Sequence, residues 1–333
     1  MLAHYALFLA QALTIVIAIL ILFGGIIAIS SKGKSRSKDR LEVKKINDKY
    51  EAMEQLLCET TCSKQELKRH HKETKKLQKE QKKSGMRKRI FVLNFQGDIR
   101  AQAVKNLREE ITGILTTATP KDEVVLRLES PGGMVHAYGL AASQLQRLRK
   151  QQIPLTVIVD KIAASGGYMM AAVGNHILSA PFAVVGSIGV IAQIPNFHKL
   201  LKKKDIEFEQ IMAGQYKRTL TLFGENTRQG REKFQEEVDE THALFKAFIL
   251  ENRPNLDMDK VATGEHWYGS RALELKLIDA IMTSDDYLLT ASRNADIYEV
   301  CYQVKKTWMS KFSTAAQQGM EQLKANLKHV TPT

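Results

Sequence analysis

The feature that most constrains the fold is a repeated succession of a short apolar run, a turn and a helical pattern, which begins near Ile90. Strands are expected at residues 90–95, 123–128, 155–159, 176–179 and 206–212. Helices are expected at residues 102–115, 135–149, 166–172, 196–203, 228–250 and 269–275. This alternation is typical of βαβ units, so it predicts an α/β domain around a mostly parallel sheet.

The turn after the apolar run 155–159 has the composition of a nucleophile turn. Two alanines lead to Ser165, and Gly166 and Gly167 follow before a second apolar run. A strand, a tight turn and a helix start would hold the hydroxyl of Ser165 at the tip of the turn, beside free backbone N–H groups, as a serine nucleophile requires. Taken alone, the motif is more typical of an ordinary glycine turn with a structural serine.

Two further segments favour the catalytic reading. Ser130-Pro131-Gly132-Gly133 follows the expected strand 123–128, and glycines let a backbone approach a ligand closely with its N–H groups exposed. Lys217 lies in the segment Gly-Gln-Tyr-Lys-Arg, directly after the expected strand 206–212. A lysine in such a place is usually a solvated surface residue, so neither segment decides the function by itself.

In this order, the three segments resemble the signal peptide peptidase A family of Ser–Lys peptidases. SPGG is similar to the family's oxyanion turn, ASGGY to its nucleophile motif and GQYKR to its general-base motif, and residues 261–273 and 277–279 are similar to its tail. The resemblance covers roughly residues 90–285 and implies a ClpP/crotonase-like fold. It also implies ring-like homo-oligomers in which Ser165 and Lys217 meet across neighbouring subunits, although a monomer with both groups in one chain stays open.

The resemblance implies a role for each site residue. Ser165 would be the nucleophile, Lys217 the general base and acid, and the amides of Gly133 and Gly166 the oxyanion donors, following the logic of Ser–Lys variants of the catalytic triad. Lysine acts as a base only where burial disfavours its ammonium form. Lys161 is nearer to Ser165 in sequence, but its place after Asp160 indicates a paired surface charge. Substrate contacts are expected from Gly132, Met134, Tyr168, Gly186 and Ser187.

The charge of the chain is concentrated in one segment. The net charge is +13, and residues 32–89 hold 20 Lys and Arg against 9 Asp and Glu. The rest of the chain is therefore almost neutral, and the basic segment lacks the interleaved aromatic residues on which bases stack. These observations argue against nucleic acid as a partner and favour membrane lipid headgroups.

Residues 5–29 are a long uncharged run that is long enough to span a bilayer as a helix. A signal peptide would have a basic start and a shorter apolar core, so retention as a single-pass anchor in a bacterial inner membrane is expected over cleavage near Ser30. The basic residues after the run favour a cytoplasmic catalytic domain, whereas the resemblance favours the periplasmic side. The side therefore stays open.

Four regions follow from these patterns. They are a transmembrane anchor at residues 1–31, a basic helical linker at 32–88, a ClpP/crotonase-like peptidase domain at 89–290 and a helical tail at 291–333. Three cysteines, Cys58, Cys62 and Cys301, imply no disulfide framework, and neither a metal nor a cofactor is expected. The chain has no phosphate-binding loop motif, so no nucleotide is expected.

The function expected from the sequence is a membrane-anchored, ATP-independent serine endopeptidase. Its substrates would be short or unfolded peptides, such as remnant signal peptides near the membrane. Two alternatives are a crotonase-fold enzyme acting on an acyl thioester and a non-catalytic membrane scaffold. Ser165 and Lys217 argue against the thioester enzyme, which would share the glycine turns, and Ser165, Lys217 and SPGG together argue against the scaffold.

Overall fold

This computed structural model of the protein describes residues 7–19, 40–69 and 87–303, together with His4, Leu22 and Lys72. The chain divides into two units, and residues 41–302 form the folded body. Residues 7–19 of the other unit are helical. Most of the expected anchor after Ile19, much of the expected linker and the tail beyond Gln303 lie outside the described residues. Within those that are described, no helix combines the length and the apolar character needed to cross a bilayer.

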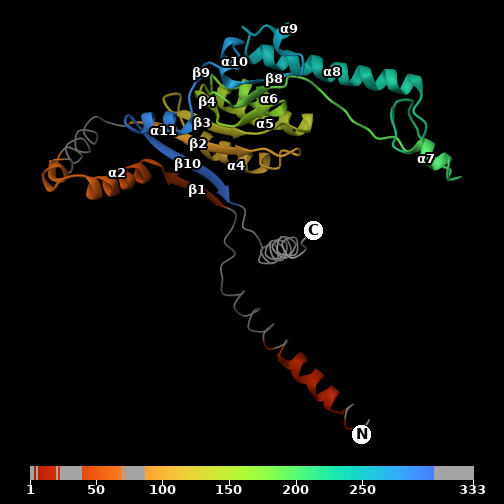
Figure 1. Cartoon of the computed structure of the whole chain (residues 1–333), viewed down its shortest axis with the longest axis horizontal. Coiled ribbons are helices and arrows are strands. Elements are labelled where there is room, and N and C mark those ends of the chain that lie inside the picture. Colours follow the sequence, from red (N-terminus) through yellow and green to blue (C-terminus); the bar gives the residue numbers. More distant parts are fainter. Residues whose placement is uncertain are drawn as a thin grey trace, which may run out of the picture. The chain divides into compact units, whose positions relative to one another are not determined.

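The centre of the body is a seven-stranded sheet with the order β1-β10-β2-β3-β4-β6-β9 (Figure 1). From β10 to β9 every pairing is parallel, as the alternation in the sequence predicts. The strands are β1 (Arg40–Lys45), β2 (Lys88–Gln96), β3 (Glu123–Glu129), β4 (Leu155–Val159), β6 (His176–Ser179), β9 (Ala280–Ile281) and β10 (Ala295–Gln303). The three central strands are the apolar runs that a sheet covered on both faces requires.

A second, three-stranded sheet carries the most distinctive turn of the sequence. It consists of β5 (Ile162–Ala164), β7 (Val184–Gly186) and β8 (His266–Tyr268). β5 pairs in parallel with β7, which pairs antiparallel with β8. A single parallel bridge between Ser130 and Ala163 connects β5 to the end of β3. The small sheet thus continues from the carboxyl end of the large one, where parallel α/β sheets place their sites.

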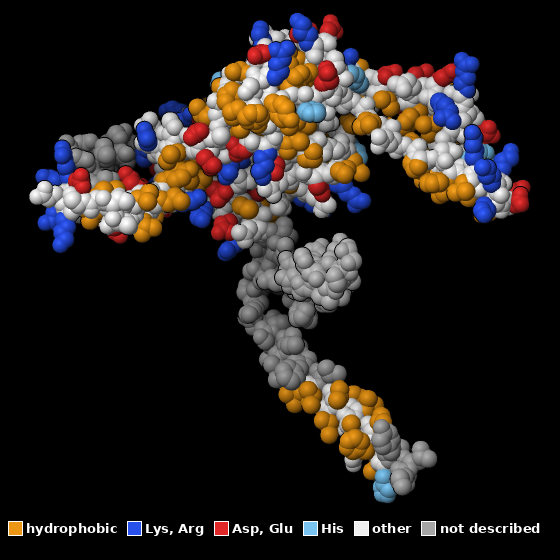
Figure 2. All heavy atoms as spheres, in the orientation of Figure 1, with side chains coloured by type: hydrophobic (Ala, Val, Ile, Leu, Met, Phe, Trp, Pro, Cys, Tyr) orange, Lys and Arg blue, Asp and Glu red, His pale blue; other side chains and the backbone are white. Residues whose placement is uncertain are grey.

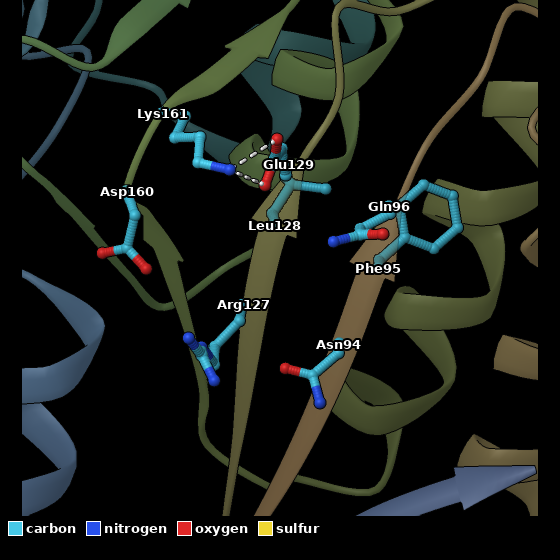
Figure 3. Close-up of a pocket in the computed structure, with 8 residues that line it drawn as sticks. All are labelled: Asn94, Phe95, Gln96, Arg127, Leu128, Glu129, Asp160 and Lys161. Atoms are coloured by element: carbon cyan, nitrogen blue, oxygen red, sulfur yellow. Dashed lines mark hydrogen bonds and ion pairs between the residues drawn. The ribbon is translucent and has the colours of Figure 1, made fainter. Parts of the chain in front are cut away.

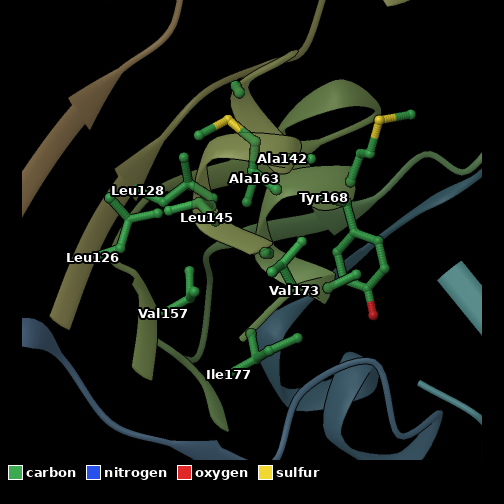
Figure 4. Close-up of a cluster of buried hydrophobic side chains, with 14 of the residues drawn as sticks. Leu126, Leu128, Ala142, Leu145, Val157, Ala163, Tyr168, Val173 and Ile177 are labelled. Atoms are coloured by element: carbon green, nitrogen blue, oxygen red, sulfur yellow. The ribbon is translucent and has the colours of Figure 1, made fainter. Parts of the chain in front are cut away.

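Successive side chains of a strand point to opposite faces of the sheet, so each face packs its own set of strand residues against helices. One face packs against α4 (Val104–Leu115), α5 (Val135–Lys150), α6 (Gly166–Ala172) and α8 (Arg228–Asn252). Leu126 and Leu128 of β3 meet Leu145 of α5 and Val157 of β4 in this larger core (Figure 4). The opposite face buries a smaller core against α11 (Ser284–Ser292). The remaining short helices are α7 (His198–Lys202), α9 (Met258–Val261) and α10 (Gly269–Glu274).

The expected helical linker is wrong at its start, because residues 40–45 are strand β1 and the helix begins only with α2 (Asn47–Thr61). The side chain of Asn47 is buried and donates hydrogen bonds to the carbonyl oxygens of Ser292 and Ala295, while it accepts one from the amide of Ile297. The amide of Ile46 donates to the carbonyl of Ile297 at 2.9 Å. These contacts join residues about 250 positions apart, so a local helical pattern does not reveal them.

Two other local assignments are corrected. Residues 295–303 of the expected helical tail form β10, and residues 295–299 of this strand pair in parallel with β2. Residues 206–212 were expected to form a strand but are not in one, and Ile206, Ile211 and Met212 are exposed. An apolar run becomes a strand only where a neighbouring strand supplies hydrogen-bond partners, and within the described part of the chain this run has none.

An ion pair at the start of β2 and β3 generates a prediction about acid stability. Arg89 donates to both carboxylate oxygens of Asp122, at 2.9 and 2.6 Å, and Thr119 donates two further hydrogen bonds. Burial alone would raise the pKa of Asp122, but the hydrogen bonds and the charge of Arg89 outweigh it and lower this pKa to about 2. The carboxylate therefore stabilises the fold above its unfolded pKa, and this stabilisation is lost as pH falls.

We expect Asp122→Asn to lower the free energy of unfolding by about 2 kcal/mol at pH 7. The difference from wild type should stay constant above about pH 5 and shrink between about pH 4 and pH 2, as the wild-type carboxylate becomes protonated. Urea unfolding across this range measures it. Glu129→Gln is the control, because its exposed pair with Lys161 should contribute about 0–1 kcal/mol. A difference that persists unchanged at pH 2 would contradict the assignment.

Candidate active site

Ser165 lies in the turn between β5 and α6, as the sequence predicts. Its backbone adopts φ 52° and ψ −120°, a conformation that a residue with a side chain rarely takes. The amide of Ser165 donates to the carbonyl of Gly186 at 2.8 Å, and its own carbonyl accepts from Met169 at 2.9 Å. Strain of this kind persists only where the surroundings over-determine the backbone, and it clusters at functional sites.

The SPGG turn packs directly against the Ser165 turn. The amide of Ser130 donates to Ile162, and the carbonyl of Ser130 accepts from Ala164 at 3.0 Å. Gly132 has φ +89°, and a Cβ on it would lie 2.8 Å from both the amide nitrogen of Gly166 and the Cβ of Ser165. Only glycine fits this approach, which brings the two motifs into contact.

The hydrogen bonds around the two turns leave several amides without an acceptor among the described residues, and those of Gly133 and Gly166 are two of them. Gly132 N–H donates to Ser130 Oγ at 3.1 Å, and Met134 N–H donates to the carbonyl of Ile99 at 2.8 Å. Between them, Gly133 N–H has no acceptor among the described residues, nor has Gly166 N–H at the first position of α6. The first amides of a helix have no partner inside it. The role of Gly133 and Gly166 as oxyanion donors stays a prediction.

A cavity of about 80 Å³ opens beside Ser165. Apolar side chains from the start of α5, from α6, from the segment after β7 and from α8 form most of its wall. The lining residues are Gly133, Val135, Ser165, Gly166, Met169, Gly189, Val190, Ile191, Thr241 and Phe245. Thr241 and Phe245 lie about 80 residues after Ser165 and belong to no local motif, so sequence reasoning missed them.

The expected substrate residues fall into two groups. Met134 is exposed, and Gly132 packs against the Ser165 turn, while Gly186 and Ser187 shape the segment that leads to the cavity. The carbonyl of Gly186 holds the amide of Ser165, and the amide of Ser187 donates to the carbonyl of Glu265. Tyr168 is different: it is fully buried and donates its hydroxyl to the carbonyl of Leu277 at 2.8 Å. It supports α6 from the core instead of facing substrate.

Lys217 does not line the cavity beside Ser165. It is an exposed residue of the arm, the name we give to residues 190–227, which project from the body with α7 (Figures 1 and 2). The arm is held by its own contacts, including a hydrogen bond from the amide of Phe197 to the carbonyl of Leu222 at 2.7 Å. A single chain therefore does not bring Lys217 to the wall of the Ser165 pocket.

Lys161 is a surface residue, as its position in the sequence indicates, but its partner is Glu129 and not Asp160 (Figure 3). The ammonium nitrogen of Lys161 lies 3.1 Å from both carboxylate oxygens of Glu129, and its side chain is 70% exposed. Asp160 instead accepts hydrogen bonds from the amide and hydroxyl of Ser284. Within the described ranges, no three His, Cys, Asp or Glu side chains are grouped to hold a metal ion.

Comparison with known proteins agrees with the three motifs. The model of the peptidase family S49 N-terminal region matches residues 1–145, and the model of peptidase family S49 matches residues 147–298. A probable protease SohB of Haemophilus influenzae is 48% identical over 330 residues, covering 95% of this chain and 93% of the relative. A probable protease SohB of Buchnera aphidicola subsp. Schlechtendalia chinensis is 49% identical over 300 residues, covering 86% of this chain and 98% of the relative. The resemblance inferred from the motifs is confirmed.

The close approach at Gly132 predicts a specific sensitivity to substitution. Gly132→Ala would place a methyl group against the Ser165 turn at a positive φ, so we expect it to cost about 1–3 kcal/mol of stability, measured by urea unfolding. Gly139→Ala is the matched control, because open space surrounds Gly139 on α5 and alanine favours a helix by about 1 kcal/mol. Equal behaviour of the two variants would contradict the packing argument.

Proposed function

The chain belongs to peptidase family S49 and is a protease, and we propose that it is a serine endopeptidase in which Ser165 is the nucleophile. One observation carries the proposal. Ser165 stands in a strained turn with the unpaired amides of Gly133 and Gly166 beside it and a cavity in front of it. Preorganised N–H groups of this kind stabilise the oxyanion that forms when a hydroxyl attacks a peptide carbonyl.

We propose that Lys217 is the general base and acid. Its neutral amine would take the proton of the Ser165 hydroxyl as the oxygen attacks the peptide carbon, and it would return that proton to the leaving amine. Water would then hydrolyse the acyl-enzyme by the same proton transfers in reverse. A lysine needs a dry environment for this role, whereas Lys217 is exposed in a single chain.

A second copy of the chain is our proposed source of that environment. The arm exposes large hydrophobic side chains next to Lys217, among them Ile211 at 96% and Tyr216 at 47%. Further exposed members are Leu200, Ile206, Phe208, Met212, Leu222 and Phe223. Exposed apolar groups gathered on one segment mark an interaction surface (Figure 2). Docking the arm on a neighbouring body would bury these groups and bring Lys217 toward the Ser165 pocket of that neighbour.

The shape and chemistry of the pocket indicate the substrate class that we propose. Val135, Met169 and Phe245 give a small apolar cavity, which suits a small or medium apolar side chain next to the cleaved bond. The sequence has no phosphate-binding loop motif for ATP-driven unfolding, so substrates would arrive extended. Short or unfolded peptides, including remnant signal peptides, meet both requirements.

The dyad proposal predicts equal losses from two substitutions. The substrate is a fluorogenic peptide with an apolar residue before the cleaved bond. Ser165→Ala and Lys217→Ala should each lower its hydrolysis by at least about 10³-fold, because loss of one member of a catalytic unit removes nearly all of its activity. Lys161→Ala is the matched control and should retain nearly full activity, since its side chain pairs with Glu129 outside the pocket. Full activity of Ser165→Ala would show that Ser165 is not the nucleophile. Loss of activity in Lys161→Ala alone would show that the base is Lys161 and not Lys217.

Mixing the two inactive variants distinguishes a shared site from a site within one chain. If Lys217 serves the Ser165 of a neighbour, co-refolded Ser165→Ala and Lys217→Ala subunits should recover a fraction of wild-type activity, because some interfaces contain both intact residues. Light scattering on the same samples should show an assembly larger than one chain. A fully active monomer would exclude the shared site, and an assembly without recovery would place both residues in one chain.

We further propose that the apolar run at residues 5–29 anchors the protein in a membrane. The proposal rests on the length of the run, the absence of charge in it and the eight Lys and Arg that follow it up to Lys49. Mass spectrometry of the carbonate-washed membrane fraction should detect the N-terminal peptide still attached to the chain. A chain that begins near Ser30 and is recovered in the soluble fraction would show that the run is a cleaved signal.

A further inference from the structure

A pair of fully buried hydroxyl groups connects the SPGG turn to α5. Ser130 Oγ and Tyr138 Oη are 2.5 Å apart, and both residues have no exposed surface. Tyr138 belongs to α5, the helix that begins just after the turn. Hydroxyl groups are costly to bury unless they are hydrogen-bonded, so a pair in this position calls for partners.

The partners fix the direction of every proton in this group. Tyr138 Oη lies 2.8 Å from the carbonyl oxygen of Asp98, which can only accept, so the tyrosine donates its proton there. Ser130 must then donate its proton to Tyr138, and Ser130 Oγ accepts from Gly132 N–H at 3.1 Å. The result is one chain of donors that runs from Gly132 through Ser130 and Tyr138 to Asp98.

This chain holds one side of the peptide that carries the free Gly133 amide. Gly132 N–H is bound to Ser130 Oγ before that peptide, and Met134 N–H is bound to the carbonyl of Ile99 after it. Gly132 adopts φ +89° and has no side chain to restrict rotation, so these two bonds decide where Gly133 N–H points. Without the bond to Ser130, the peptide could rotate about Gly132.

Tyr138 also supports the second amide. A Cβ on Gly166 would overlap the ring of Tyr138, which shows that the ring lies directly against the first residue of α6. Gly97 leaves room for the hydroxyl pair, because a Cβ there would overlap both Ser130 Oγ and Tyr138 Oη. Tyr138 thus contacts Ser130, which fixes the peptide before the Gly133 amide, and it also contacts Gly166 directly.

We propose that Ser130 and Tyr138 are positioning residues that align the Gly133 and Gly166 amides with the oxyanion. The proposal rests on the proposed function of Ser165 as the nucleophile. Neither residue touches substrate, since both are sealed from solvent. Their contribution should therefore be felt in the chemical step and not in substrate binding, because the oxyanion exists only after attack.

Burial raises the pKa of Tyr138 above its ordinary value, and Ser130 only partly offsets this. The tyrosine stays protonated throughout the neutral range, so the donor chain keeps its direction there. Loss of either hydroxyl should accordingly lower the rate by a similar factor across that range, without a new step in the pH profile.

Steady-state kinetics of Ser130→Ala, Tyr138→Phe and the double variant test the proposal. Removal of one oxyanion donor costs about 10²–10³ in kcat, so misalignment of a donor should cost about 10- to 100-fold. We expect that loss in kcat with KM within about twofold of wild type, and a parallel fall in the rate of phosphonate labelling. Because the two hydroxyls act in one chain, the double variant should be no slower than the slower single variant.

The control is Tyr287→Phe, which also removes a hydroxyl that donates inside the fold. Tyr287 lies on α11 at the opposite face of the sheet and bonds to Glu123 at 2.5 Å. It should lower the melting temperature and leave kcat unchanged. Tyr138→Phe retains the ring that packs against Gly166, so it decides the question even if Ser130→Ala does not fold.

Two failures are distinguishable. If wild type shows no Ser165-dependent hydrolysis or labelling, the proposed function fails and the positioning role fails with it. In the second case, wild type is active, and Ser130→Ala and Tyr138→Phe lower only the melting temperature and leave kcat unchanged, as Tyr287→Phe does. The hydroxyls are then structural, and only the positioning role is overturned. A rise in KM at constant kcat would equally overturn it.

Discussion

The bridge between Ser130 and Ala163 is the contact on which the site depends. Two backbone hydrogen bonds, Ser130 N–H to Ile162 and Ala164 N–H to Ser130, join the end of β3 to β5. They bring the SPGG turn of one βαβ unit against the serine turn of the next. Without this register the Gly133 and Gly166 amides would belong to separate loops, and the strained backbone of Ser165 would lose the neighbours that hold it.

Much of the body could be predicted because the decisive information is local. β2, β3 and β4 are apolar runs bounded by turns, and α5 and α8 have a helical period over many residues. β1 and β10 escaped prediction because their assignment depends on pairing with distant strands. The buried Asn47, whose three hydrogen bonds all reach residues 292–297, is the clearest example of such a long-range determinant.

The same distinction separates the two halves of the candidate site. Ser165, Gly132 and Gly166 were recognisable because a tight turn demands small residues at fixed offsets. Phe245 and Thr241 were not, because a cavity wall supplied by a helix 80 residues away has no local signature. The local structure expected before Lys217 was wrong. Residues 206–212 do not form a strand, and their apolar side chains are exposed to solvent in a single chain.

These exposed residues connect folding to activity under the proposed assembly. A buried core, two glycine turns and the Ser130–Tyr138 hydroxyl pair hold the half of the site with the proposed nucleophile in one chain. The base half would become dry only when the arm docks on a neighbour. Activity would then depend on subunit concentration by mass action, and an anchor in the plane of a membrane would raise that concentration. Under this proposal, a serine turn that is preorganised but lacks its base would be inactive alone, so association itself would switch on proteolysis.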